Sequence, residues 1–200
     1  MVDVAVEALG ASPGHRLQGP TPCHRFTLRG ELRDGSPLEL VLTDVGAAVC
    51  RVRCADRDGR VDDVVLDVDH ADRVVPGGHP YLGVTVGRWA NRLGGARVVV
   101  DGAEVVLDAN EGPNQLHGGS LGWSWFVWDH ELLDDGVRFT RTSPAGEMGF
   151  PGTVEAAVTV RIDADGIDIG HEATSDAPTV VSMTNHAYWN LGGPGAATVA

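Results

Sequence analysis

The chain has 200 residues, with 28 acidic and 15 basic side chains and a formal net charge of −13 at pH 7. That charge repels phosphate backbones and anionic lipid surfaces, so it argues against nucleic acid and membrane partners and favours a neutral small molecule. All basic residues are arginine, and the absence of lysine excludes Schiff-base, pyridoxal-phosphate and phosphate-loop chemistry.

Short runs of valine, threonine, isoleucine and leucine alternate with polar residues, which is the period of half-buried strands. Asp-Gly pairs between many of these runs favour tight hairpin turns. Because the chain holds 27 glycines and 11 prolines, we expect little helix. The pattern predicts an all-β, antiparallel sandwich with strands at 24–32, 38–45, 47–54, 61–68, 96–101, 103–108, 125–133, 137–142, 153–163, 166–174 and 179–185.

We expect the first residues of the chain to be organised differently from the rest. Residues 1–23 are expected to form an extended or poorly ordered lead-in, and residues 24–200 one domain. The lead-in does not read as a secretory signal, and no stretch is long enough to span a bilayer. The odd number of cysteines, three, predicts reduced thiols and a cytoplasmic location.

Three polar segments carry the candidate chemistry. His186 follows a predicted strand among amide and aromatic neighbours, and histidine exchanges a proton near neutral pH. His117 lies in the glycine-rich loop 109–124, where the backbone approaches a ligand closely, although a turn histidine without function is an equal alternative. Asn91 and Arg92 offer donors and acceptors for vicinal hydroxyls, although such an arginine is more often a solvated edge or salt-bridge partner.

The sequence also supports expectations about the tryptophans and about metal binding by histidine. We expect Trp189 and Trp123 near the site, where indole rings stack on sugar faces, and Trp128 in the core. We predict no metal site, because His117, His171 and His186 share no compact ligand spacing and have no cysteine partners.

The chain resembles the aldose 1-epimerase, or galactose mutarotase, family through four motifs in order. They are Gly-Arg-Trp-Ala-Asn-Arg at 87–92, Asn-Gln-Leu-His-Gly-Gly at 114–119, Gly-Phe-Pro-Gly at 149–152 and Thr-Asn-His-Ala-Tyr-Trp-Asn-Leu at 184–191. The resemblance implies a galactose mutarotase-like β-supersandwich that interconverts the α and β anomers of hexoses such as galactose and glucose without a cofactor.

The resemblance also implies residue roles. His186 is similar to the general acid that protonates the ring oxygen, and His117 assists at that oxygen. Asn91, Arg92 and Tyr188 resemble substrate contacts.

The family's catalytic base, a glutamate, and a substrate-binding aspartate that precedes it have no matching position here. Glu147, Glu155 and Glu172 match no motif for that base. We therefore expect an incomplete C-terminal part, and a 200-residue chain that is inactive and marginally stable when alone.

Two other functions remain open from the sequence. One is a carbohydrate-binding module without catalysis. The other is a relative acting on hexose 6-phosphates, for which Arg88 and Arg97 would supply positive charge. A glycosidase would require two carboxylates across the scissile bond, and the marked residues are imidazoles. The oligomeric state is left open.

Overall fold

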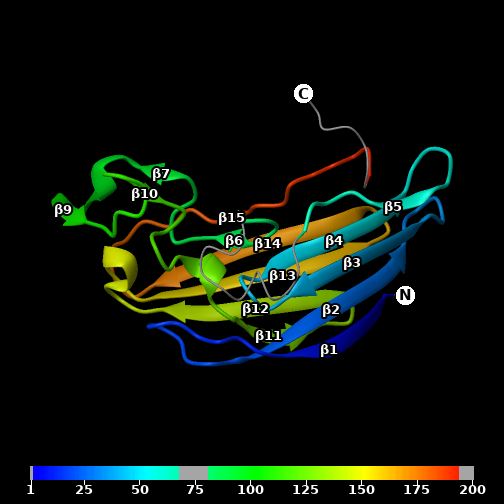
Figure 1. The fold of residues 1–200 in the computed structure, drawn as a ribbon, viewed down its shortest axis with the longest axis horizontal. Coiled ribbons are helices and arrows are strands. Elements are labelled where there is room, and N and C mark those ends of the chain that lie inside the picture. Colours follow the sequence, from blue (N-terminus) through cyan, green and yellow to red (C-terminus); the bar gives the residue numbers. More distant parts are fainter. Residues whose placement is uncertain (1, 68–80, 194–200) are drawn as a thin grey trace.

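The structure, a computed structural model, describes residues 2–67 and 81–193. Two antiparallel sheets face each other (Figure 1). The first has the order β1-β2-β3-β4-β5, with β1 Asp3–Ala11, β2 Pro22–Glu31, β3 Pro37–Thr43, β4 Ala48–Ala55 and β5 Val61–Asp63. The second has the order β11-β12-β13-β14, with β11 Asp129–Leu132, β12 Gly136–Ser143, β13 Val154–Asp163 and β14 Gly166–Ser175.

The main core lies between these sheets. Alternate residues of β2 and β3, such as Phe26 and Leu40, pack in one buried cluster with Phe139 of β12 and Val158 of β13. This period of two is what the sequence pattern predicted, because side chains of a strand point alternately to opposite faces. Burial of these apolar side chains supplies the main force that holds the sheets together.

Three short strand pairs stand beside the sandwich. They are β6 Thr85–Val86 with β15 Thr184–Asn185, β7 Arg92–Leu93 with β10 Gln115–Leu116, and β8 Arg97–Val100 with β9 Ala103–Val106. The helices among the described residues are short 3-10 turns, at η1 Gly94–Ala96, η2 Trp123–Trp125 and η3 Glu147–Gly149. None has the length and apolar character needed to cross a bilayer. The all-β antiparallel prediction is confirmed.

The Asp-Gly pairs lie at hairpin connections, as predicted. At the β8–β9 turn, both Asp101 and Gly102 have positive φ, at 54° and 80°. Two consecutive residues of positive φ form the turn whose twist matches that of the flanking strands. The other four pairs fall at the β2–β3, β4–β5, β11–β12 and β13–β14 connections.

Several predicted elements differ from the observed ones. Residues 3–11, within the predicted lead-in 1–23, form β1 and pair with β2. The predicted strand 125–133 begins inside η2, and only residues 129–132 are a strand. Most of the predicted strand 179–185 is irregular because it pairs only at β15 and through a Ser182–Trp89 bridge. The last residue of the predicted strand 61–68 lies outside the described residues.

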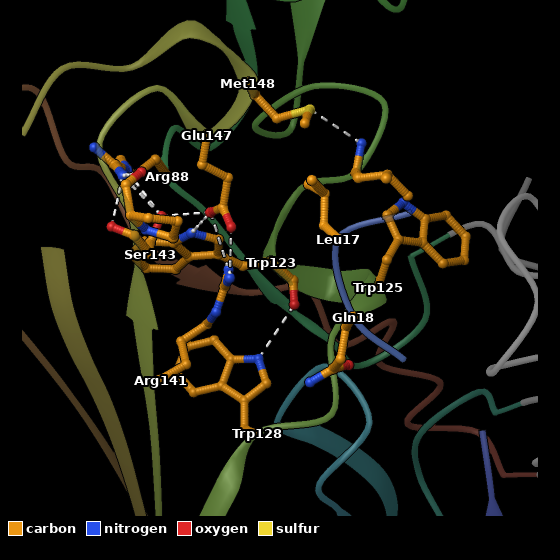
Figure 2. Close-up of polar contacts among 12 residues, drawn as sticks. Leu17, Gln18, Arg88, Trp123, Trp125, Trp128, Arg141, Ser143, Glu147 and Met148 are labelled. Carbon is orange, nitrogen blue, oxygen red and sulfur yellow. Dashed lines mark hydrogen bonds and ion pairs between the residues drawn. The ribbon is translucent and has the colours of Figure 1, made fainter. Parts of the chain in front are cut away.

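A buried charged network lies beside the core (Figure 2). The guanidinium of Arg141 donates to the carboxylate of Glu147 at 2.7 Å, and both side chains are almost fully buried. Trp123 Nε1 donates to the same carboxylate at 3.1 Å, and Ser143 Oγ also binds it. Arg141 lies 3.8 Å from the centroid of the Phe126 ring. The buried pair is therefore hydrogen-bonded to its neighbours and stacked on an aromatic ring.

Replacement of Arg141 by alanine should strongly destabilise the fold. It would leave Glu147 buried without its cation, and breaking a buried pair in this way costs about 3–5 kcal/mol. Arg138→Ala is the matched control, because Arg138 lies on the same strand and pairs with the exposed Glu172. Its cost should stay below about 1 kcal/mol. Urea denaturation of both variants measures the difference, and equal costs would contradict this account.

Candidate functional site

The backbone of His186 is fixed by a neighbouring connection. Its N–H donates to the carbonyl of Val84 at 2.9 Å, and its carbonyl accepts from the N–H of Gly83 at 3.0 Å. The side chain of Asn185 also donates to the Gly83 carbonyl at 2.9 Å. These bonds continue the β15–β6 pairing, so the half-buried His186 ring projects from a defined position at a strand end.

His117 is held by the loop that carries Asn91. Its backbone N–H donates to the Asn91 carbonyl at 3.1 Å, and its Nδ1 accepts from the Asn91 N–H at 3.1 Å. Because Nδ1 is an acceptor, the proton of the neutral ring lies on Nε2. His117 therefore presents Nε2–H as a hydrogen-bond donor.

Two tyrosine rings join the two imidazoles in one cluster. The His117 and His186 ring centroids are 5.0 Å apart with planes at 88°. Tyr188 lies 5.1 Å from His186, and Tyr81 lies 4.7 Å from His117 and 6.0 Å from His186. We call His117, His186, Tyr81 and Tyr188 the imidazole cluster. Trp125 extends it, with its ring 6.2 Å from Tyr81.

The two imidazoles differ electrostatically. Burial, and then the nearby His186 and Arg92, lower the pKa of His117 to about 4, whereas Glu111 acts in the opposite direction. His117 is thus neutral over the physiological range. A neutral His117 adds no positive charge beside His186.

Arg92 and Asn91 form the polar rim of the cluster. The Arg92 Nε and Nη2 atoms each donate to one Glu111 oxygen, both at 2.6 Å. Arg92 Nη1 also donates to Asn91 Oδ1 at 3.3 Å. Glu111 therefore fixes the guanidinium, and Arg92 orients the Asn91 amide.

Close packing of glycines holds the two loops together. A Cβ on Gly118 would lie 1.9 Å from the Gly87 carbonyl oxygen, and a Cβ on Gly87 would overlap the Trp123 ring. The Gly87 carbonyl also accepts from the Trp123 N–H at 3.1 Å. Only glycine permits this approach, which brings the segment before Asn91 against the segment after His117.

The structure brings the sequence-predicted site residues into one connected group: His186, His117, Asn91, Arg92 and Tyr188. Their roles stay predictions. Sequence reasoning missed Tyr81, Glu111 and Trp125. Glu111 lies in the loop 109–124 that was singled out, so its position was a usable signal. The sequence around Tyr81 holds no such signal beyond the residue type itself.

The structure corrects one prediction about tryptophan. Trp123 is 1% exposed and belongs to the core, where it packs at 5.8 Å against Trp128, itself in the core as predicted. The neighbouring Trp125 approaches the cluster instead. Trp189 is 55% exposed, and its backbone pairs with Val65.

The arginines considered for a phosphate group do not fit that role. Arg88 is 1% exposed, and its guanidinium donates to Ser143 and to the carbonyls of Pro144, Pro151 and Gly152. Arg97 pairs with Glu104 on the exposed β8–β9 hairpin. Both guanidinium groups are therefore already bonded within the protein, which removes the support for a hexose 6-phosphate site.

The carboxylates considered as a base are bonded elsewhere. Glu147 pairs with Arg141, Glu172 pairs with Arg138, and Glu155 accepts from Thr142 at 2.8 Å. In the described ranges, the ion pairs of histidine with carboxylate involve His24 and His130, and none reaches His117 or His186. A cavity of about 820 Å³ also lies elsewhere, lined by none of the cluster residues.

Several known proteins resemble the chain in sequence. A family model described as aldose 1-epimerase matches residues 30–199. The galactose mutarotase of Sus scrofa is 34% identical over 199 residues, covering 100% of this chain and 55% of that protein. The aldose 1-epimerase of Escherichia coli K12 is 37% identical over 168 residues, covering 81% of this chain and 47% of that protein.

Solved structures give the same result. A GalM/aldose epimerase homologue from C. elegans is 33% identical with a TM-score of 0.71, covering 77% of this chain and 48% of that one. A galactose 1-epimerase from Lactobacillus acidophilus is similar in fold, with a TM-score of 0.77 and 24% identity, covering 96% and 54%. The chain spans about half the length of the curated relatives it matches.

Substitution of Gly118 tests the close approach of the two loops. Gly118 and Gly146 have nearly the same φ, +85° and +86°, but a Cβ on Gly146 meets nothing within 4 Å. Gly146→Ala should cost about 1 kcal/mol from the positive φ alone. Gly118→Ala should cost at least about 2 kcal/mol, because the loops must also separate. Thermal and urea unfolding compare the two variants, and equal costs would show that the contact is not tight.

The protonation of His117 is open to direct measurement by NMR titration. Its imidazole resonances should titrate near the lowered pKa of about 4. His186→Ala should raise this pKa, because it removes a neighbouring positive charge. Since the folded pKa lies below the unfolded value of about 6.5, the unfolded state binds more protons between these values. The contribution of His117 to stability is therefore lost as the pH falls through that window. An ordinary pKa for His117 would refute the assignment of a neutral donor.

Proposed function

Because this chain belongs to the aldose 1-epimerase family, we propose that its imidazole cluster interconverts the α and β anomers of a hexose such as galactose or glucose. The observation that carries the proposal is the pair of imidazoles 5.0 Å apart, of which one is kept neutral by its surroundings. The relatives named galactose mutarotase and aldose 1-epimerase support the same substrate class.

The reaction requires two proton movements on a cyclic hemiacetal. A proton reaches the ring oxygen while another leaves the anomeric hydroxyl, and the ring opens to the free aldehyde. Rotation about the C1–C2 bond then exposes the other carbonyl face, and closure reverses the proton movements. An enzyme accelerates this by holding an acid and a base on opposite sides of the anomeric centre.

In this proposal, His186 is the general acid toward the ring oxygen. His117 donates its Nε2–H hydrogen bond to the same oxygen without giving up the proton, because its lowered pKa keeps the ring neutral. One imidazole thus delivers the proton, and the other positions the oxygen that receives it. No cofactor is needed for this chemistry.

Asn91, Arg92 and Tyr188 are proposed as contacts for the sugar hydroxyls. Arg92 is already paired with Glu111, so it would present its remaining donors in a fixed orientation. Tyr81 and Trp125 offer apolar ring faces beside the cluster for the C–H face of a pyranose.

The base is proposed to be a carboxylate that the described residues do not bring to the cluster. Glu111, the carboxylate at the rim, has both oxygens bound by Arg92. Sugar binding without catalysis is therefore the second candidate function, favoured by this absence of a free carboxylate beside the imidazoles in the described part of the chain.

Three broader assignments belong to the same proposal. The partner is a monosaccharide, and the location is cytoplasmic, consistent with the reduced thiols of Cys23 and Cys54. Residues 24–200 form the mutarotase-like domain, to whose sheet β1 adds an edge strand.

Chemical rescue by a small carboxylate tests the proposed function. Polarimetry on fresh α-galactose should show little acceleration by the 200-residue chain alone. Added acetate should then supply a base and accelerate mutarotation beyond its own effect in buffer. His186→Ala should lower this acetate-dependent rate at least about tenfold, because it removes the acid.

His171→Ala is the matched control and should keep the rescued rate, since His171 lies on β14 outside the cluster. An equal rescued rate for the parent chain and His186→Ala would contradict the acid role. Galactose binding by calorimetry without any acetate-dependent rate would favour the binding module. Acceleration without acetate would show that no further base is required.

A further inference from the structure

A second group of ionisable side chains joins the two main sheets. His24 lies on β2, Asp44 follows β3, and His130 lies on β11. Asp44 Oδ2 is 2.7 Å from His24 Nδ1 and 3.6 Å from His130 Nδ1. The two imidazole centroids are 4.7 Å apart. We call these three residues the His-Asp-His group. They are separate from the imidazole cluster of the sugar site.

Backbone bonds fix the group before any ligand arrives. The N–H of His24 donates to Asp44 Oδ1 at 2.9 Å, and the N–H of Trp128 donates to the Asp44 carbonyl at 2.9 Å. The first bond ties Asp44 to β2, and the second ties it to the segment that leads into β11. Phe26 packs against His130 at 4.8 Å, so one imidazole rests on the edge of the core.

All three residues line the cavity of about 820 Å³. The carboxylate of Asp44 is 1% exposed, whereas the side chains of His24 and His130 are 28% and 27% exposed. The group therefore has a closed side, formed by the core, and an open side toward the cavity. A further ligand or a water molecule has access from that open side.

The buried carboxylate requires a positive partner. A proton on His24 Nδ1 can form a hydrogen bond with the Asp44 carboxylate. His130 Nδ1, at 3.6 Å, is beyond hydrogen-bond distance of the same carboxylate. Metal-to-donor distances of about 2.0–2.2 Å in tetrahedral geometry place neighbouring donor atoms about 3.3–3.5 Å apart. The His130–Asp44 distance is close to that value. The His24–Asp44 distance would have to open by about 0.7 Å, which the partly exposed His24 side chain has room to do.

We propose that His24, Asp44 and His130 bind one divalent transition-metal ion of the zinc class, with the cavity side left for a water molecule or a further ligand. Two imidazoles and one carboxylate form a donor set that suits zinc, cobalt or nickel, whereas magnesium and calcium prefer oxygen donors. The ion replaces the proton between His24 and Asp44. It also links the two sheets directly, because its ligands come from both.

This site uses none of the histidines weighed from the sequence. The prediction of no metal considered His117, His171 and His186, whereas the group forms from residues 24, 44 and 130. Its members are separated by 20 and 86 positions, so no local spacing could reveal them. Their proximity results from the packing of β2 against β11.

Metal binding should raise the thermal stability of the protein. The test is a set of melting curves of the metal-free protein with and without Zn²⁺. At free Zn²⁺ about 100-fold above the dissociation constant, the midpoint should rise by about 5–10 °C, because the ion binds only the folded state. Co²⁺ should add visible absorption bands of a low-symmetry site with nitrogen ligands.

Three variants locate the ion. His130→Ala and His24→Ala should each lose the Zn²⁺-dependent rise and the Co²⁺ bands. His171→Ala should keep both, because His171 lies in the same cross-strand row as His130 but three strands away, a separation on the order of 14 Å. His186→Ala should also keep both, which separates this site from the sugar site.

Two results would overturn the proposal. One is the absence of any Zn²⁺-dependent rise and Co²⁺ absorption in the folded parent protein. The other is a rise that persists in His130→Ala and His24→Ala, or that disappears in His186→Ala, since the ion would then bind elsewhere. Isothermal calorimetry of the folded His130→Ala variant with Zn²⁺ measures the loss of binding independently of any change in stability.

Discussion

The contact between the Asn91 loop and the His117 loop is the constraint on which the rest of the imidazole cluster depends. Asn91 accepts from the backbone of His117 and donates to its ring, so the two loops define each other. The contact is possible because Gly87 and Gly118 approach more closely than any side chain would allow. The Trp123 ring packs against Gly87 from the core side. The loop contact that positions the His117 imidazole therefore depends on glycine at both positions, because a Cβ atom at either one would prevent it.

The same contact sets the tautomer of His117. Occupation of Nδ1 by the Asn91 N–H leaves Nε2–H as the outward donor of His117, and burial keeps the ring neutral. The ring of His186 lies on the other chain segment, and its backbone, rather than its ring, is tied to the Val84 connection. The ring of His117 is therefore fixed in tautomer, whereas His186 is positioned through its backbone. Two neighbouring imidazoles thereby lie in different surroundings.

Much of the fold was predictable from local rules. Strand alternation and Asp-Gly turns depend on neighbours along the chain, so the hairpins were found where the sequence placed them. The strand β1 was missed because glycine and proline after it suggested a loop, although pairing with β2 overrides that local preference. The start of the predicted strand 125–133 was wrong, because residue 125 belongs to η2 and only residues 129–132 form a strand. In this segment, contacts with residues distant in the sequence determine the conformation. Hydrophobic periodicity along the chain does not report such contacts.

Candidate site residues were predictable where they stand in motifs. His117, His186, Asn91, Arg92 and Tyr188 lie in such segments and form one group. Their partners Tyr81 and Trp125 were not predictable, because each is brought to the cluster by tertiary packing. Glu111 was easier to predict, because its loop was recognised as a candidate site and its negative charge suits a pair with Arg92.

The protein compensates its buried charges in three ways, and the difference distinguishes structural groups from candidate sites. Arg88 is enclosed by backbone carbonyls, and Arg141 is neutralised by Glu147, so both guanidinium groups are bonded within the protein. Asp44 is different, because two partly exposed imidazoles approach one of its oxygens and only one of them is within hydrogen-bond distance. A proton alone leaves His130 without a bond to the carboxylate, whereas a metal ion uses all three donors. The His-Asp-His group is therefore the one of these three groups in which a cavity-lining side chain lies beyond hydrogen-bond distance of the buried charge.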